Sequence, residues 1–305
     1  MKTEWTAPVF NIVHGSLVDG WGVRTTVFLK GCPLRCLWCC NPEGQKLCNE
    51  LQYTAEDCNG CGRCIDVCPK QAITADRPGG IPVIDRDICD NCFACVADCP
   101  TGALDRFAKV YTVEELYKEL IKDEGYFGSD GGVTIGGGEA SMHGRFTLEL
   151  IKKLQRDYIH VALDTCGYIT SQEGLAAFDT ADLVLFDIKG MDDALHKEAT
   201  GVSNKLIHEN LMRRNASGKD IIIRLPIIPG YSDSSENIRQ TAELLAPLKA
   251  VKRVDVLLMH TYSGLKYRQL GIPMPAVFEE TLPEEKGQEI LDCFAAYGLQ
   301  AQLGG

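Results

Sequence analysis

The sequence has no long apolar run, only 6 histidines, and fewer cationic than anionic residues. No stretch of roughly 18 apolar residues occurs, so we expect no membrane-spanning helix. Residues 1–10 lack a basic region followed by an apolar stretch, so we predict no secretory signal and expect a cytoplasmic protein. The 31 Lys and Arg against 42 Asp and Glu give a net charge of −11. This charge disfavours nucleic acid and membrane surfaces as partners, because both carry negative phosphates.

Long repeats and low-complexity tracts are also absent, whereas cysteine is abundant, with 15 residues. An odd count in a chain without a secretory signal favours metal-bound thiolates over disulfides. Cysteine density divides the chain into three parts. Residues 1–49 hold the first cysteine group, 50–105 hold two similar runs, and 106–305 hold only Cys166 and Cys293. We interpret these parts as the start of a barrel, an insertion, and the remainder of the barrel.

Strand and helix patterns alternate in the last part. Strands are expected at 133–135, 160–164, 183–188, 221–228 and 254–259. Helices are expected after an N-cap at Thr112 and around 148–154, 174–178, 206–214, 238–248 and 285–297. Repeated strand–helix units predict an α/β fold with a parallel sheet, whose chemistry lies at the carboxyl ends of the strands. Polar and glycine residues gather at those ends, namely Gly136 to Glu139, Asp164, Asp187, Lys189 and His260. Turn residues are also common at strand ends for structural reasons alone.

The first cysteine group has the spacing C-x3-C-x2-C, formed by Cys32, Cys36 and Cys39. Three thiolates on one tight loop can hold three corners of a cubane and leave the fourth iron open to a substrate, as a catalytic zinc site leaves one position open. Trp38, an aromatic residue just before the third cysteine, adds to the pattern. Cys40 in place of Cys39 is an alternative third ligand. A zinc site is another alternative, but the motif lacks a histidine partner of the usual kind.

The other two runs share the spacing C-x2-C-x2-C-x3-C-P of bacterial ferredoxins, in which the fourth cysteine ligates the other cluster. We therefore assign Cys58, Cys61, Cys64 and Cys99 to one cluster, and Cys68, Cys89, Cys92 and Cys95 to the other. A zinc ribbon built from two C-x2-C pairs would leave the other cysteines without a role. Cys48, Cys166 and Cys293 fit no cluster pattern, and we expect them to be small buried apolar residues.

With these motifs, the chain resembles the glycyl radical enzyme activating enzymes of the radical S-adenosylmethionine (SAM) superfamily. The resemblance extends over nearly the whole chain and includes Phe10-Asn11-Ile12, the segment from Asp19 to Thr25, and Asn41-Pro42-Glu43. It implies a partial (β/α)6 TIM-like radical SAM barrel with an inserted bis-4Fe–4S ferredoxin-like domain at 50–105. It also implies three 4Fe–4S clusters, SAM as cosubstrate, and a monovalent cation.

The resemblance also assigns site residues. Trp38 is expected near the cofactor, Gly137, Gly138 and Glu139 at the amino group of SAM, and Arg224 near its carboxylate. Asp164 and Lys189 would contact SAM, Asp187 would lie at the cation site, and His260 would lie near the ribose. Four positions depart from the usual family pattern. Trp21 and Ala140 replace proline, Gly136 replaces serine, and the glycine that follows the family histidine comes one residue later here, at Gly264. These departures bear on which partner is recognised.

The implied reaction begins with SAM bound to the open iron. One electron from the reduced cluster cleaves the sulfonium, and the resulting 5′-deoxyadenosyl radical removes hydrogen from a backbone glycine of a partner enzyme, for which we expect an arylacetate decarboxylase. Reduced ferredoxin or flavodoxin would supply electrons through the two ferredoxin-type clusters, which could instead only brace the insertion. We expect a monomer. The alternatives are a radical SAM enzyme for a small molecule, an electron-transfer protein and a zinc-binding module.

Overall fold

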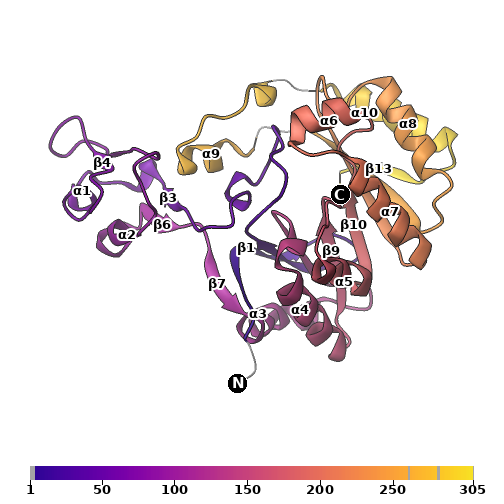
Figure 1. The fold of residues 1–305 in the computed structure, drawn as a ribbon, viewed down its shortest axis with the longest axis horizontal. Coiled ribbons are helices and arrows are strands. Elements are labelled where there is room, and N and C mark those ends of the chain that lie inside the picture. The colour runs from indigo at the N-terminus through magenta and orange to yellow at the C-terminus, as the bar shows by residue number, and fades with distance from the viewer. Residues whose placement is uncertain (1–3, 260–261, 280–281, 305) are drawn as a thin grey trace.

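The computed structural model describes residues 4–259, 262–279 and 282–304, and these contain one sheet of nine strands (Figure 1). The strands follow the order β13-β12-β11-β10-β9-β8-β2-β1-β7. Their bounds are β1 (Thr6–Ser16), β2 (Arg24–Leu29), β7 (Lys109–Thr112), β8 (Gly132–Gly137), β9 (His160–Thr165), β10 (Leu183–Asp187), β11 (Ile221–Ile227), β12 (Val251–Leu258) and β13 (Ala301–Leu303).

Strands β2 and β8 to β13 are parallel, whereas β1 pairs antiparallel with both β2 and β7. The apolar run of β10 is buried from Leu183 to Phe186, as expected for a parallel strand covered on both faces. The predicted parallel sheet is therefore confirmed. Strands β1, β7 and β13 were not predicted; β7 lies at one edge and β13 at the other.

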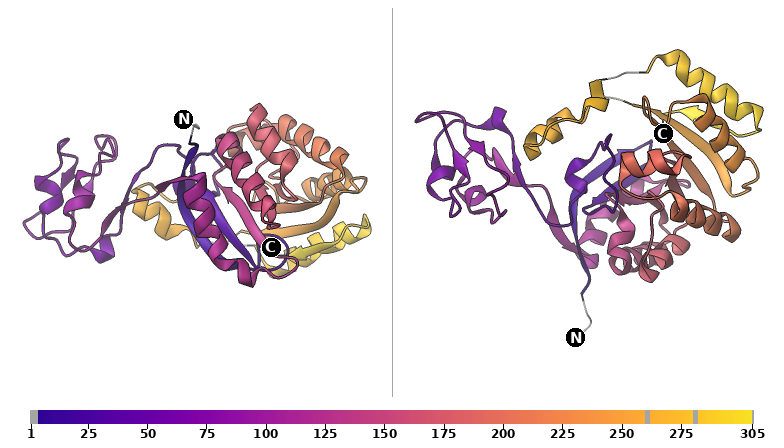
Figure 2. Two further views of the ribbon diagram at one scale, coloured as in Figure 1. Left: turned by 90° about the horizontal axis from the view of Figure 1, so that it is seen from below. Right: turned by 45° about the horizontal axis from the view of Figure 1, so that its top comes forward.

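Helices connect the parallel strands and cover the outer face of the sheet (Figure 2). The N-cap prediction at Thr112 is confirmed, because its side chain accepts from the Glu115 N–H and Glu115 returns the contact as a capping box. Helix α6 was not predicted. The helices here are α3 (Val113–Leu120), α4 (Gly144–Arg156), α5 (Gln172–Thr180), α6 (Asp193–Thr200), α7 (Lys205–Ser217), α8 (Ser235–Leu245), α9 (Gly264–Leu270) and α10 (Glu284–Ala296), with 3-10 turns η1 (Pro42–Gly44), η3 (Ile121–Tyr126), η4 (Ala140–His143) and η5 (Ala276–Glu279).

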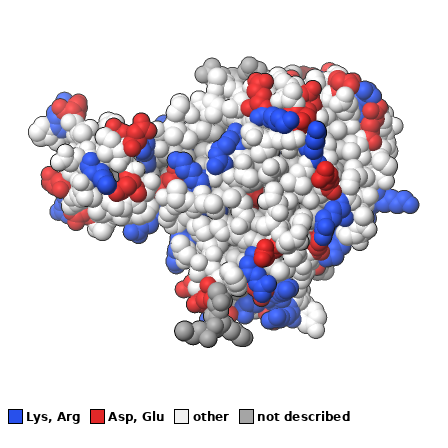
Figure 3. Space-filling view, in the orientation of Figure 1, with Lys and Arg blue, Asp and Glu red and all other residues white. Residues whose placement is uncertain are grey.

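Residues 51–106 form a lobe that projects from the sheet domain (Figures 1 and 2), and we call it the insertion lobe. Its small core includes Leu51, Ile73 and Leu104 together with Cys64 and Cys95. Acidic and basic side chains are interspersed on the face that Figure 3 shows, on the lobe as well as on the sheet domain. The elements of the lobe are β3 (Leu51–Tyr53), η2 (Ala55–Asp57), α1 (Arg63–Asp66), β4 (Ile73–Thr74), β5 (Val83–Ile84), α2 (Ala94–Asp98) and β6 (Leu104–Arg106), with β3 and β6 paired at its base.

Among the described residues, none of the helices combines the length and the apolar character that crossing a membrane requires.

Candidate active site

The loop after β2 carries Cys32, Cys36 and Cys39, three half-buried cysteines whose thiols interact with one another. Burial, ahead of the repulsion among these groups, raises the pKa of Cys36 to about 12 and that of Cys39 to about 11. Ligation to a positively charged metal group favours the thiolate form that burial disfavours. The chemistry of three electrostatically interacting thiols on a single loop therefore fits an iron–sulfur cluster.

Helix α6 fixes the backbone of this loop. The N–H of Arg35 donates to the Thr200 carbonyl across 2.7 Å, and the N–H of Leu37 donates to the Ala199 carbonyl across 3.0 Å. The last carbonyls of a helix have no partner within the helix, so they are free to accept these bonds. The C-terminal turn of α6 thus positions the segment between the first and third cysteines.

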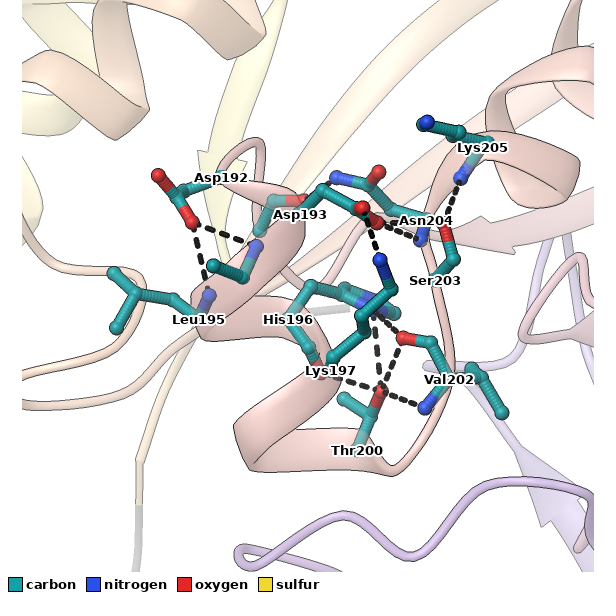
Figure 4. A network of polar contacts seen from close by, with 12 residues as sticks. Asp192, Asp193, Leu195, His196, Lys197, Thr200, Val202, Ser203, Asn204 and Lys205 are labelled. Carbon is teal, nitrogen blue, oxygen red and sulfur yellow. Dashed lines mark hydrogen bonds and ion pairs between the residues drawn. The ribbon is translucent and has the colours of Figure 1, made fainter.

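A dense set of polar contacts holds α6 and the turn that follows it (Figure 4). Asp193 accepts from the Ser203 hydroxyl at 2.6 Å and from the Asn204 N–H at 3.1 Å. His196 Nδ1 lies 2.8 Å from the Val202 carbonyl oxygen. The support beneath the cysteine loop is therefore itself cross-linked by hydrogen bonds.

Glycines at the end of β8 lie directly against the same loop. A Cβ on Gly138 would lie 2.3 Å from the carbonyl oxygens of both Gly31 and Gly44, which is far inside van der Waals contact. Gly137 has φ +126° and lies equally close to Leu29 of β2. Only glycine fits here, because the backbone of the cysteine loop occupies the place of a side chain.

Glu139 is fully buried and connects β8 to β9. Its carboxylate accepts from the Thr165 hydroxyl at 2.9 Å, from the Cys166 N–H at 2.8 Å and from the Ser141 N–H at 3.1 Å. These bonds hold Glu139 in place, and its contact with the amino group of SAM stays a prediction.

Charged side chains converge near the carboxyl ends of three neighbouring strands, β9, β10 and β11. Arg224 donates to Asp164 across 3.0 Å and lies 3.6 Å from Asp19, while Lys189 donates to Asp187 across 2.7 Å. The register of the sheet explains the grouping, since Asp187 is paired with Arg224 and Asp164 is paired on the adjoining strand. The structure therefore brings together four residues that the sequence predicted separately.

The electrostatics of this group follow from burial and pairing. Burial raises the pKa of Asp164 to about 7, although Arg224 opposes the shift. Burial acts to lower the pKa of Lys189, but the Asp187 carboxylate and the nearby Cys36 thiol outweigh it and raise that pKa well above its ordinary value. A permanent ammonium thus lies beside the cysteine loop, where anionic groups of a ligand would be stabilised.

Three further residues named from the sequence are Trp38, Cys40 and His260. Trp38 is 5% exposed and packs in an apolar cluster, with its ring centroid 5.8 Å from that of Tyr231. The Cys40 thiol is 3.9 Å from the Trp38 carbonyl oxygen of its own loop. His260 lies outside the described residues.

The eight cysteines of the insertion lobe line two separate cavities, with four in each. In the described part of the chain, no three Cys, His, Asp or Glu side chains form a group that could hold a single metal ion. The cavities bring together cysteines from different runs, in the combination that the ferredoxin spacing predicts. The first is lined by Cys58, Cys61, Cys64 and Cys99, and the second by Cys68, Cys89, Cys92 and Cys95.

Two of the three cysteines outside the cluster motifs differ from expectation. Cys166 is buried as expected, but Cys48 is exposed and Cys293 only half-buried, because Cys48 belongs to a surface loop and Cys293 to the partly covered helix α10. The Cys166 thiol also forms a hydrogen bond with the Cys32 thiol, which is the main cause that lowers the pKa of Cys32. Sequence reasoning missed this contact; the signal was the position of Cys166 two residues after Asp164.

Tyr267 on α9 is a second residue near the site that the sequence did not assign to it. Its hydroxyl donates to the Cys39 carbonyl across 2.9 Å. The neighbouring Lys266 forms an ion pair with Glu43 at 2.7 Å, just after the cysteine loop. More than two hundred residues separate these partners, so no local pattern could have indicated the contacts.

A three-cysteine loop above the carboxyl ends of parallel strands defines a radical SAM protein, and the profile described as the radical SAM superfamily matches residues 26–245. A solved structure of Streptococcus suis SuiB bound to precursor peptide SuiA is similar in fold, with a TM-score of 0.51 and 15% identity over 63% of this chain and 42% of that one.

Two curated relatives narrow the class. The chain is 38% identical to an isethionate sulfite-lyase activating enzyme of Nitratidesulfovibrio vulgaris, over 97% of this chain and 94% of the relative. It is also 38% identical to a 4-hydroxyphenylacetate decarboxylase activating enzyme of Clostridium scatologenes, over 86% of each. The chain belongs to the glycyl radical enzyme activating enzymes of this superfamily.

Proposed function

We propose that this chain installs a glycyl radical on a partner enzyme, using SAM at a 4Fe–4S cluster held by Cys32, Cys36 and Cys39. The observation that carries the proposal is that these three cysteines lie on one loop after the carboxyl end of β2, with Cys32 and Cys36 within electrostatic reach of Lys189. When bound, the cluster supplies the electron that cleaves SAM into methionine and a 5′-deoxyadenosyl radical.

In this proposal the chain's own residues bind SAM and orient it. We propose that Lys189 attracts the carboxylate of SAM, and that Asp187 holds Lys189 in place or ligates a monovalent cation beside it. Arg224, fixed by Asp164 and Asp19, presents its guanidinium to the same part of the ligand. Trp38 packs behind the cysteine loop and excludes water from that side. His260 is proposed near the ribose on the family resemblance alone.

We further propose that the insertion lobe is a ferredoxin-like domain with two 4Fe–4S clusters. The support is that its cysteines divide into two cavities of four, each with ligands from both runs. In this role the clusters pass single electrons from a reduced ferredoxin or flavodoxin to the cluster in the barrel. The chain would act as a monomer that docks transiently on its partner.

The partner enzyme is proposed from the relatives. One is named for isethionate sulfite-lyase and the other for 4-hydroxyphenylacetate decarboxylase, at the same 38% identity. We propose a glycyl radical enzyme with a small anionic substrate, of which an arylacetate decarboxylase is one case.

The experiment is anaerobic reconstitution with iron and sulfide, followed by reductant, SAM and each candidate partner in turn. The expected result is a glycyl radical EPR signal on one partner, with formation of methionine and 5′-deoxyadenosine. SAM cleavage without a signal on any partner would favour a small-molecule radical SAM enzyme. No cleavage at all would indicate an electron-transfer protein, and a colourless protein that binds zinc would indicate an interaction module.

A further inference from the structure

Strand β3 of the insertion lobe contributes to the walls of both cysteine-lined cavities. Leu51 and Tyr53 belong to the same face of the strand, because side chains alternate between the two faces. Leu51 lines the second cavity, whereas Tyr53 lines the first together with its four cysteines. Both side chains pack in the small core of the lobe. The strand thus gives the second cavity an apolar side chain and the first cavity a phenol.

The phenol of Tyr53 carries a hydroxyl that is left over. Its oxygen is buried and has no hydrogen-bond partner among the described residues. The ring alone would satisfy the packing of the core, and a buried hydroxyl without a partner destabilises the fold. Such a group therefore indicates that something else at the cavity completes its hydrogen bonding.

The ionisable groups that act on this phenol are thiols of the same cavity. Burial, followed by Cys58 and then by Cys64 and Cys99, raises the pKa of Tyr53 above its ordinary value. The phenol therefore keeps its proton and is available as a donor. When a cluster is bound, its sulfurs would be the acceptors that the cavity offers, and they belong to the cysteine ligands or to the cubane itself.

Hydrogen bonds on both sides of Tyr53 hold β3 in place. Arg86 donates to the Leu51 carbonyl at 2.6 Å and to the Gln269 carbonyl of α9 at 2.9 Å. The side-chain amide of Gln269 in turn donates to the Thr54 hydroxyl at 3.0 Å. A residue whose backbone is fixed on both sides presents its side chain in one place, as a group that orients toward a cofactor must.

We propose that the Tyr53 hydroxyl donates a hydrogen bond to a sulfur of the cluster in the first cavity and thereby raises the reduction potential of that cluster. The inference rests on the proposed function, because it requires a cluster at Cys58, Cys61, Cys64 and Cys99. Leu51, which β3 places at the second cavity, has no donor, so the second cluster receives no such bond from this strand.

The bond acts by stabilising the reduced form of the cluster. When titanium(III) citrate gives up one electron, titanium is oxidised to titanium(IV) and the cluster gains one negative charge; the phenol keeps its proton and no bond is broken. A donor at a sulfur stabilises the added negative charge. Removal of the hydroxyl should therefore lower the potential of the first lobe cluster and leave those of the other two clusters unchanged.

The test is an EPR-monitored redox titration of the cluster-loaded full chain, without SAM or partner, for wild type, Tyr53→Phe and Tyr126→Phe. The first variant removes one oxygen and keeps the ring that packs in the lobe. Tyr126, a 74% exposed residue of η3, is the matched control. We expect Tyr53→Phe to reduce the equilibrium constant for reduction of one lobe cluster about tenfold, equivalent to roughly 59 mV for one electron. Tyr126→Phe should leave all potentials at their wild-type values.

Wild-type potentials in a fully loaded Tyr53→Phe, or an equal shift in Tyr126→Phe, overturn the inference and leave the proposed function standing. If Tyr53→Phe loads less iron than wild type, Tyr53→Leu is titrated in its place, since leucine is the residue that β3 places at the second cavity; the same signal should shift in the same direction. Failure of both variants to hold the first cluster would assign Tyr53 to the folding of the lobe and would also overturn the inference. A wild type that holds only the barrel cluster would instead contradict the proposed function of the lobe.

Discussion

Arg224 of β11 reaches across the intervening β10 to donate to Asp164 of β9 at 3.0 Å. The Asp164 side chain is 20% exposed, and its partial burial raises the pKa of the carboxyl to about 7 despite the guanidinium. The two residues form a brace near the carboxyl ends of the strands, where the proposed ligand binds. Placing the charged Asp164 carboxylate in this setting lowers the stability of the fold, and the loss depends on pH because the protonated carboxyl carries no charge.

Asp164→Asn should remove this pH dependence. The pKa of Asp164 is higher in the folded protein than its ordinary value of 3.8, so between about pH 4 and pH 7 the folded form binds more proton than the unfolded form. The contribution of Asp164 to stability is therefore greatest at low pH and falls as the pH rises through that window. Wild type should lose up to about 4 kcal/mol relative to the variant across it.

The measurement is the apparent melting temperature of wild type and Asp164→Asn at pH 5.5 and pH 8, under anaerobic conditions. The melting temperature of wild type, relative to that of Asp164→Asn, should be lower at pH 8 than at pH 5.5. Asp130→Asn, which alters an exposed residue before β8, is the matched control and should follow wild type at both values. A pH-independent difference for Asp164→Asn would contradict the raised pKa.

Gly138→Ala should displace the cysteine loop. Its Cβ would meet the Gly31 and Gly44 carbonyl oxygens at 2.3 Å, and both belong to backbone that cannot move aside cheaply. We expect loss of the barrel cluster while the two lobe clusters are retained. Gly125→Ala is the control, because a Cβ there meets nothing within 4 Å. Iron analysis and EPR of the SAM-responsive signal report the result; normal SAM binding by Gly138→Ala would refute the packing argument.

The sequence predicted the residues of the candidate site more fully than the long-range contacts that hold them in place. The strand expected at 183–188 is β10 at 183–187, and the cysteine spacing predicted the two mixed groups that line the cavities. Spacing carries this information because it is local. The contacts of Tyr267 with Cys39 and of Arg86 with Gln269 join segments more than 180 residues apart, and they arise only when α9 packs against the cysteine loop and the lobe.

Helix α6 was missed for a different reason. It spans only Asp193–Thr200, and its apolar residues are too few to show a helical period in the sequence. Its N-cap Asp192, which accepts from two backbone N–H groups, was the available signal. Sequence patterns describe elements with an extended apolar face well, whereas short helices held mainly by polar contacts give little periodicity.

Lys189→Met should weaken SAM binding by at least about tenfold, because it removes a charge-assisted hydrogen bond worth roughly 1.5–3 kcal/mol. The half-buried Asp187 would also lose its partner at 2.7 Å. Lys197→Met is the control, since Lys197 pairs with Asp193 on the exposed face of α6. Equilibrium binding of SAM to the reconstituted protein is the measurement. Equal SAM affinities for Lys189→Met and Lys197→Met would show that Lys189 does not contact SAM.

Paired cysteine substitutions should show which cysteines share a cluster in the insertion lobe. Cys58 and Cys99 come from different runs but line one cavity, whereas Cys58 and Cys68 come from one run but line different cavities. If each fourth cysteine ligates the other run's cluster, Cys58→Ser with Cys99→Ser removes one cluster, and Cys58→Ser with Cys68→Ser removes two. If each run holds its own cluster, the two outcomes are exchanged.

Iron content distinguishes these cases without any assay of activity. A protein with three clusters contains about 12 iron atoms, so we expect about 8 for Cys58→Ser with Cys99→Ser and about 4 for Cys58→Ser with Cys68→Ser. Cys293→Ser, in the partly covered helix α10, should retain all of them. The comparison between the two double variants is informative because each carries the same number of changed ligands, so general damage to the lobe would lower both equally. The reverse order of iron content would disprove the mixed assignment.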